Sequence, residues 1–265
     1  MNSEVIDYGV CRLAIVPVRK APDERSEQIT QLLFGDHYEV SGGSPDKHWT
    51  SIRIIADQVE GWIDSRQHHS ITPEYLEQIN QADFKITLDV ATTILYKKSP
   101  LTIVLGSIVP ISTSELFKIE EQFAFNGESK SLSQRRDFEF LRTIAMRYIN
   151  APYQWGGKSP FGIDAGGFVQ MVYRICGYSL QRQVFLQASH GKKVNTLTDA
   201  RPGDLIFFSD KEGKPYHAGI LLGEDKIIHA GGKVRMDYIN EEGILNSETK
   251  IYSHFLSGIR RVLAP

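Results

Sequence analysis

Cysteine, long apolar runs and net charge are all scarce in this sequence. Its 265 residues include two cysteines, Cys11 and Cys176, which are too few for a disulfide framework. No apolar run is long enough to cross a bilayer, and a formal net charge of −2 offers no basic face for nucleic acid. With 41% hydrophobic and 23% charged residues, the composition predicts an ordinary globular protein without a membrane span or a nucleic-acid partner.

The first residues also lack a secretory signal. Residues 1–7, MNSEVID, contain neither a basic n-region nor an apolar h-region. We therefore expect a cytoplasmic protein. Export stays open if a signal peptide has been removed.

The N-terminal third predicts a small β-barrel. Short apolar segments broken by polar turns are expected to be strands over residues 31–34, 38–40, 49–54 and 60–63. Thr72 followed by Pro73 has the cap-then-proline pattern of a helix start. We place the first domain at residues 1–80, closed by this helix.

A second β-rich stretch follows at residues 81–130. Residues 89–96 and 101–107 are rich in β-branched side chains, and residues 116–120 are expected to add a strand. The polar segment 126–131 is expected to be a loop that ends this second barrel.

The apolar period changes in the last domain, residues 131–265. Helical spacing of the apolar residues predicts helices over 138–148 and 165–176. The segments that follow, at 204–208, 217–222, 227–229 and 258–262, are expected to be strands. Helices followed by an antiparallel sheet give the α+β class.

One sequence run points to a known family. Pro152-Tyr153-Gln154-Trp155-Gly156-Gly157 precedes Asp164-Ala165-Gly166-Gly167-Phe168, and further on come Arg201-Pro202-Gly203-Asp204-Leu205, His217-Ala218-Gly219-Ile220 and Ile228-His229-Ala230. Over residues 134–262 this series resembles the NlpC-type, papain-like cell-wall cysteine peptidases. In that family the first run ends in Asp-Cys-Ser-Gly-Phe, so alanine stands here where the nucleophilic cysteine is expected.

The N-terminal barrels resemble a frequent neighbour of such peptidases. Residues 18–22, 33–36 and 61–63 are similar to the pattern of bacterial SH3-type domains. The resemblance implies a papain-like domain, helices and then an antiparallel sheet, preceded by two small SH3-type β-barrels.

The resemblance assigns three positions to the reaction. Ala165 occupies the nucleophile position, His217 is the base, and His229 orients the first imidazole. A helix N-terminus and a neighbouring imidazole would stabilise a thiolate at 165, but alanine has no sulfur to ionise. Cys176 cannot replace it, because eleven helical residues put it about 16 Å away.

Five further residues are implied to bind substrate. They are Tyr153, Trp155, Asp164, Gly166 and Glu27, with Asp164 also able to cap the helix. Active relatives resemble γ-D-glutamyl-L-diamino acid endopeptidases, so the implied ligand is a peptidoglycan-derived peptide with a free N-terminal L-Ala. Glu27 would supply the acid that relatives offer to this amine, and Val59 would occupy the position of their tyrosine.

No cofactor or metal is implied. The pair His68-His69 lacks a matching metal-ligand spacing, and we interpret it as a solvated loop.

Two hypotheses explain Ala165. A natural pseudoenzyme would bind muropeptides or a protein partner, whereas an engineered Cys-to-Ala change would leave an active cell-wall peptide endopeptidase inactive as written. Gly166, Gln183 and Val184 also depart from the family pattern, which favours natural divergence, although the retained histidines favour an intact enzyme. A different nucleophile, Ser159 or Ser189, lacks any motif context.

Overall fold

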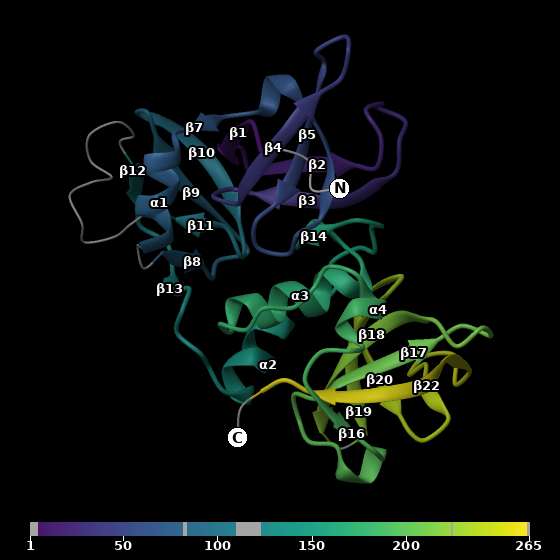
Figure 1. The fold of residues 1–265 in the computed structure, drawn as a ribbon. Helices are drawn as coiled ribbons and strands as arrows, with labels where there is room; N and C mark the ends of the chain where they lie inside the picture. The colour runs from purple at the N-terminus through teal and green to yellow at the C-terminus, as the bar shows by residue number, and fades with distance from the viewer. Residues whose placement is uncertain (1–4, 82–83, 110–122, 224, 264–265) are drawn as a thin grey trace. The chain divides into compact units, whose positions relative to one another are not determined.

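The computed structural model describes residues 5–81, 84–109, 123–223 and 225–263 (Figure 1). The chain divides into two compact units, residues 1–134 and 135–265. Each unit is described by itself below.

The first unit opens with a seven-stranded antiparallel sheet in the order β3-β2-β6-β5-β4-β1-β7. The sheet overlaps all four strand segments predicted in this region, and α1 begins at Pro73, where Thr72 accepts a hydrogen bond from the Tyr75 amide. The elements are β1 (Asp7–Val10), β2 (Ile15–Arg19), β3 (Gln28–Leu33), β4 (His37–Gly43), β5 (Trp49–Ile54), β6 (Glu60–Asp64), the 3₁₀ turn Ser65–Gln67, β7 (Ser70–Ile71) and α1 (Pro73–Gln81).

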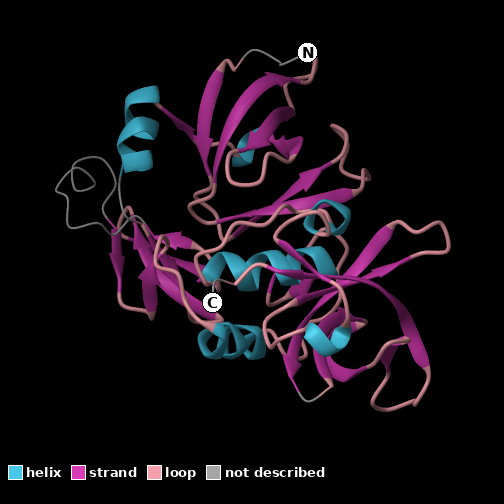
Figure 2. Ribbon diagram, turned by 60° about the horizontal axis from the view of Figure 1, so that its bottom comes forward, coloured by secondary structure: helices cyan, strands magenta, loops and turns pink. Residues whose placement is uncertain are grey.

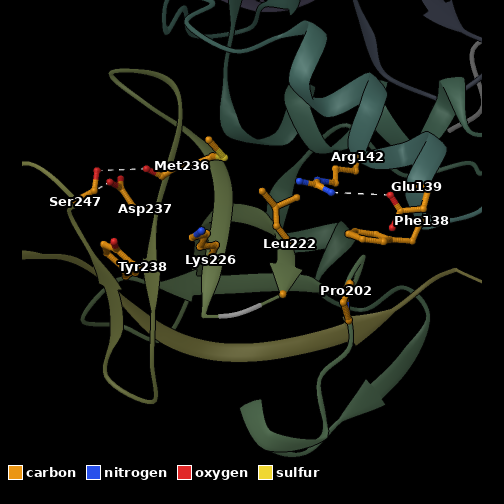
Figure 3. Close-up of a pocket in the computed structure, with 11 residues that line it drawn as sticks. Phe138, Glu139, Arg142, Pro202, Leu222, Lys226, Met236, Asp237, Tyr238 and Ser247 are labelled. Atoms are coloured by element: carbon orange, nitrogen blue, oxygen red, sulfur yellow. Dashed lines mark hydrogen bonds and ion pairs between the residues drawn. The ribbon is translucent and has the colours of Figure 1, made fainter.

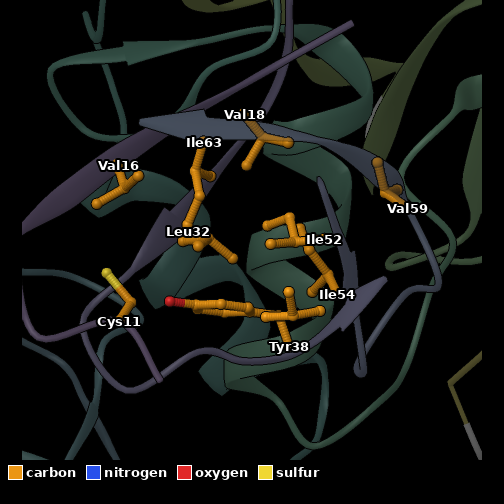
Figure 4. Close-up of a cluster of buried hydrophobic side chains, with 10 residues drawn as sticks. Cys11, Val16, Val18, Leu32, Tyr38, Ile52, Ile54, Val59 and Ile63 are labelled. Atoms are coloured by element: carbon orange, nitrogen blue, oxygen red, sulfur yellow. The ribbon is translucent and has the colours of Figure 1, made fainter. Parts of the chain in front are cut away.

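Alternating side chains of these strands build a closed apolar core (Figure 4). Tyr38 is fully buried at its base, and Gly9 makes room for it, because a Cβ at residue 9 would lie 2.2 Å from the tyrosine ring. Cys11 belongs to the same cluster, so its interpretation as a small buried hydrophobe is confirmed.

The interpretation of His68 as solvated is wrong. Its Nδ1 lies 3.0 Å from the Tyr38 hydroxyl, and its Nε2 lies 3.1 Å from a carboxylate oxygen of Asp7. The ring therefore links β1 to β4, and it contacts the buried Tyr38 hydroxyl, which also accepts from the His69 amide at 3.3 Å.

Two three-stranded sheets follow in the same unit, in the orders β10-β9-β12 and β11-β8-β13. Their strands are β8 (Lys85–Thr87), β9 (Ala91–Tyr96), β10 (Ser99–Val104), β11 (Ile108–Val109), β12 (Phe123–Phe125) and β13 (Ser129–Ser131). The loop expected over 126–131 is wrong at its end, because residues 129–131 pair with β8. The strand expected at 116–120 lies outside the described residues.

Apolar side chains from both parts of this unit share a core. Phe34 packs with Ile94, Ile103 and Val109, and the Ile108 amide donates to the Phe34 carbonyl. The boundaries expected at 80/81 and 130/131 stay predictions.

The second unit combines helices with a seven-stranded antiparallel sheet in the order β16-β22-β17-β18-β19-β20-β21 (Figure 2). Strand β22 pairs with β17 through its second half and with β21 through its first half, so the sheet closes on itself. The elements are α2 (Phe138–Arg147), β14 (Lys158–Ser159), β15 (Gly162–Ile163), α3 (Ala165–Ile175), α4 (Val184–Gln187), β16 (Lys192–Val194), the 3₁₀ turn Leu197–Asp199, β17 (Leu205–Ser209), β18 (Pro215–Gly223), β19 (Lys226–Gly231), β20 (Lys233–Ile239), β21 (Gly243–Leu245) and β22 (Tyr252–Arg261).

Helix α3 begins where expected and ends at Ile175, one residue before the predicted end, with Cys176 as its C-cap. It follows its N-cap Asp164, and beyond Cys176 the next residue, Gly177, adopts a left-handed φ of 85°. Phe168, Val172 and Ile175 are fully buried, and α3 packs against β18 and β19. Cys176 is buried and outside any disulfide, and it lies at the far end of the helix, as predicted.

Candidate functional site

Ala165 is the first residue of α3 and is buried. The preceding Asp164 holds this helix end in place: one carboxylate oxygen accepts from the Gly167 amide at 2.7 Å, and the other accepts from the Gly156 amide at 2.8 Å. The capping role expected of Asp164 is confirmed. The helix start is thus rigidly tied to the loop that carries Trp155-Gly156-Gly157.

Arg182, which sequence reasoning did not single out, makes a buried ion pair with the same carboxylate. Its two terminal nitrogens donate to the two oxygens of Asp164 at 2.9 and 2.7 Å. Both side chains are almost fully buried. Two amides and one bidentate guanidinium therefore occupy the four acceptor positions of Asp164.

Gly166 lies against the segment that carries Arg182. A Cβ at residue 166 would lie 2.6 Å from the Arg182 carbonyl oxygen and 3.3 Å from Val184. The carbonyl of Gly166 accepts from the side-chain amide of Gln187 at 3.0 Å. The backbone around residue 166 is thus fitted to glycine, and a side chain there would require this segment to move.

Three neighbouring strands bring His217, His229 and Asp237 into one hydrogen-bonded series. Nε2 of His217 on β18 lies 2.8 Å from Nδ1 of His229 on β19, and Nε2 of His229 lies 3.0 Å from a carboxylate oxygen of Asp237 on β20. All three residues are at most 4% exposed. The strand registers place them on one face of the sheet, since Gly219 pairs with His229 and Ile227 pairs with Asp237.

The charge of Asp237 fixes the protons along this series. Burial alone would raise the pKa of its carboxyl, but hydrogen bonds from His229, Ser247 and Arg235 outweigh burial and hold that pKa below its usual range. The ionised carboxylate accepts from Nε2–H of His229, so Nδ1 of His229 accepts from Nε2–H of His217. Nδ1 of His217 then carries a lone pair, and within the described residues it makes no hydrogen bond.

His217 is kept in its neutral form. Burial, followed by the neighbouring His229 and His254, lowers the pKa of the His217 imidazole well below its ordinary value. The series therefore presents a neutral base whose unused nitrogen can accept a proton or a hydrogen bond.

The other expected site residues have varied settings. Tyr153 and Trp155 are 40% and 60% exposed, on the loop between α2 and β14. Burial, followed by the charge of Asp164, raises the pKa of Tyr153. In the first unit, Glu27 is exposed and pairs with Lys20 at 3.4 Å, and Val59 is buried in the barrel core. The ligand contacts expected of these residues stay predictions.

A separate hollow of about 620 Å³ lies in the second unit (Figure 3). Its lining includes Leu222, Met236 and Tyr238, which alternate along their strands with residues of the histidine face. Most of the hollow therefore opens on the other face of the sheet, although Asp237 also borders it. It is lined by Phe138, Glu139, Arg142, Pro202, Leu222, Gly223, Lys226, Met236, Asp237, Tyr238 and Ser247.

The described ranges contain neither a metal-ion cluster nor a membrane-crossing helix. Within 5–81, 84–109, 123–223 and 225–263, no group of three or more His, Cys, Asp or Glu side chains is arranged to hold a metal ion. No helix in those ranges is long and apolar enough to cross a membrane.

Comparison with known families and structures identifies the second unit. Residues 150–252 match the NlpC/P60 family, and residues 18–67 match the bacterial dipeptidyl-peptidase SH3 domain. The segment 150–252 is an NlpC/P60 family domain. The NlpC/P60 match includes both candidate histidines, Asp237 and the start of α3.

Two relatives align with this chain over more than the NlpC/P60 domain. The chain is 29% identical over 222 residues to the γ-D-glutamyl-L-lysine dipeptidyl-peptidase of Bacillus subtilis, covering 76% of this chain and 71% of the relative. It is 26% identical over 245 residues to dipeptidyl-peptidase 6 of Lysinibacillus sphaericus, covering 83% and 88%. These relatives support a cell-wall peptidase scaffold.

A solved structure has the same fold. An NlpC/P60 family protein from Bacillus cereus aligns with a TM-score of 0.76 at 18% identity, covering 96% of this chain and 99% of that one. The chain thus combines the papain-like NlpC/P60 fold with an SH3-type domain.

Asp237 was absent from the expected site, although the sequence contains a signal for it. The Gly231-Gly232 turn folds β20 back onto β19, and alternation then places Asp237 on the same face as His229. No comparable local signal marks Arg182 or His254, because each reaches the site through long-range packing.

Proposed function

We propose that this protein binds peptidoglycan stem peptides without cleaving them, as a natural pseudoenzyme built on a γ-D-glutamyl-L-diamino acid endopeptidase scaffold. The observation that carries the proposal is the intact series His217–His229–Asp237 in an NlpC/P60 domain whose nucleophile position holds Ala165. Alanine cannot form an acyl intermediate. In a related nucleophilic mechanism, loss of the nucleophile alone lowers turnover by on the order of 10⁶.

The surroundings of Ala165 support natural divergence over a single engineered change. A serine follows the cysteine in the family pattern, but here the backbone of Arg182 approaches Gly166 too closely for a Cβ. Gln183, at the N-cap of α4, makes no side-chain capping bond. Several linked positions thus differ together, as expected of a chain that has adapted to its present sequence.

The alternative is an active endopeptidase of cell-wall peptide recycling that carries a Cys-to-Ala change at residue 165. The buried, hydrogen-bonded histidine series favours this reading, since a site without any ligand need not keep its base. Both readings require a ligand at the same place.

The ligand we propose is a short peptide with a free N-terminal L-Ala, such as L-Ala-γ-D-Glu-L-Lys. Tyr153 and Trp155 offer exposed aromatic surface on the loop that precedes β14. The same proposal includes three further expectations. Residues 81–130 form a second SH3-type barrel, the last domain consists of helices followed by the sheet, and the protein is cytoplasmic.

Isothermal titration calorimetry of the full chain tests this function. We expect saturable binding of L-Ala-γ-D-Glu-L-Lys, with weaker binding of the same peptide acetylated at its amine. The α-linked isomer is the control for the γ-linkage. Equal affinity for all three peptides, or no heat from any of them, would contradict the proposal.

A further inference from the structure

A third histidine, His254, reaches the site from β22, the strand that closes the sheet by pairing with both β17 and β21. His254 on β22 pairs with Ile244 of β21, and Ile244 belongs to the apolar core on the sheet face that carries His217. The rings of His254 and His217 are stacked, with centroids 4.0 Å apart and planes at 24°. Tyr216 stacks on His254 in turn, at 5.8 Å and 26°.

This stack covers a face of His217, whereas the hydrogen bond to His229 uses its edge. The ring of His229 stands nearly perpendicular to His217, at 87°, and Phe208 lies 5.8 Å away. His217 is thus held by an edge contact from β19 and a face contact from β22. Only closure of the sheet by β22 brings the face contact about.

We propose that His254 is a positioning residue: by stacking on His217, it holds that ring in place and neutral, so that Nδ1, which the hydrogen bond to His229 leaves with a lone pair, accepts a hydrogen bond from an N–H or O–H group of the ligand. The ligand class rests on the proposed function. The effect of His254 on His217 does not, and it can be measured without ligand.

The electrostatics of the cluster agree with this geometry. Burial and the neighbouring His229 lower the pKa of His254 to about 4, against the opposing charge of Asp237. A proton on either stacked ring would face a second imidazole at close range, in a site where burial already disfavours charge.

The titratable neighbours of His254 come from three strands. They are Tyr216 and His217 on β18, His229 on β19 and Asp237 on β20, whereas β17 and β21 contribute the uncharged Phe208 and Ile244. Asp237 is the one anion in this described set, and Arg235 pairs with it at 2.9 Å. The cluster therefore offers little compensation for an imidazolium.

A neutral acceptor at Nδ1 selects the ligand group that meets it. An amide N–H or hydroxyl donates to the lone pair, whereas a carboxylate has no proton to give and is repelled. Binding of such a donor group should persist as the pH falls, until His217 takes up a proton.

NMR titration of the full chain tests the positioning role. Long-range ¹H–¹⁵N spectra report the tautomer and the midpoint of each histidine. We expect His217 to remain the Nε2–H tautomer through pH 5.5. The variant His254→Leu removes the stacked ring. In this variant the titration midpoint of His217 should rise by at least one pH unit.

His254→Phe separates stacking from charge. It keeps an aromatic ring against His217 but cannot be protonated, so we expect a smaller rise and an unchanged tautomer. This variant carries the test if His254→Leu fails to fold. His190→Phe, at an exposed position, is the matched control and should leave His217 unchanged. An unchanged midpoint of His217 in every folded His254 variant would overturn the proposal.

Binding at two pH values tests the ligand side. Between pH 7.5 and 5.5, affinity of the native chain for L-Ala-γ-D-Glu-L-Lys should change less than twofold. His254→Leu should lose about tenfold if the pKa of His217 returns to its ordinary value near 6.5. If the native chain also loses about tenfold in affinity for the peptide, Nδ1 of His217 is not the acceptor of the ligand's hydrogen bond. Absence of any binding would overturn the proposed function but leave the NMR result intact.

Discussion

Arg182 donates two hydrogen bonds to Asp164, at 2.9 and 2.7 Å, on the same carboxylate that caps the helix bearing Ala165. The pair holds together the helix start, the preceding glycine loop and the segment that leads into α4. It therefore shapes the candidate site although neither charge is exposed to solvent.

Arg182→Ala should destabilise the protein by about 3–5 kcal/mol, because it leaves the Asp164 carboxylate buried without its cation. Urea unfolding measures this change. Arg66→Ala is the matched control, since Arg66 is 81% exposed where it pairs with Asp64 and its loss should leave stability nearly unchanged. Equal losses in the two variants would contradict the account of the buried pair.

Gly166→Ala should cost about 1–3 kcal/mol, because the new Cβ meets the Arg182 carbonyl at 2.6 Å. Thermal and urea unfolding report the cost. Gly258→Ala, where a Cβ meets nothing within 4 Å, should stay within about 0.5 kcal/mol of the native chain. If Gly166→Ala is as stable as the native chain, the backbone there is not fitted to glycine.

His68→Leu should destabilise the first unit by about 1–3 kcal/mol, because the buried Tyr38 hydroxyl loses the nearer of its two partners, at 3.0 Å, and keeps only the His69 amide at 3.3 Å. His48→Leu, at an exposed position in the same unit, is the control. Proteolysis or hydrogen exchange resolved to residues 5–81 would locate the change. If His68→Leu loses no more stability than His48→Leu, the His68 ring is not held by Tyr38 and Asp7, and the solvated interpretation would stand.

Stability should fall as the pH drops from about 6.5 toward about 4. The folded-state pKa values of His217 and His254 lie below the ordinary value near 6.5, so the unfolded chain binds more protons in this window. The contribution of Asp237 has the same sign but is lost at lower pH, because its folded-state pKa lies below the usual carboxyl range.

Urea unfolding at pH 7.5, 6 and 5 checks this dependence. His254→Phe should have a shallower decline, since one of the two histidines no longer titrates, whereas His190→Phe should decline like the native chain. A free energy of unfolding that is constant from pH 7.5 to 5 would contradict the neutral histidine cluster.

Local sequence signals predicted much of the C-terminal fold. Asp164 marked the start of α3, and short continuous apolar runs marked β17, β18 and β19, because these signals act within a few residues. The resemblance to NlpC-type peptidases also implied that His217 and His229 form a pair, and in the structure the two rings are hydrogen-bonded at 2.8 Å.

The missed residues depend on long-range packing. Arg182 lies 18 residues from its partner Asp164, and His254 meets His217 only because β22 closes the sheet. His68 was misread for the same reason, since Asp7, 61 residues away, fixes its ring. The cytoplasmic location and the ligand contacts of Glu27 stay predictions.

Cleavage of L-Ala-γ-D-Glu-L-Lys by Ala165→Cys, followed by mass spectrometry beside a binding titration, tests the central claim most directly. The account of a natural pseudoenzyme predicts that the variant binds the peptide as the native chain does but cleaves it no faster than the native chain. Rapid release of L-Ala-D-Glu by the variant would contradict it, and would identify an endopeptidase from which only the sulfur is missing.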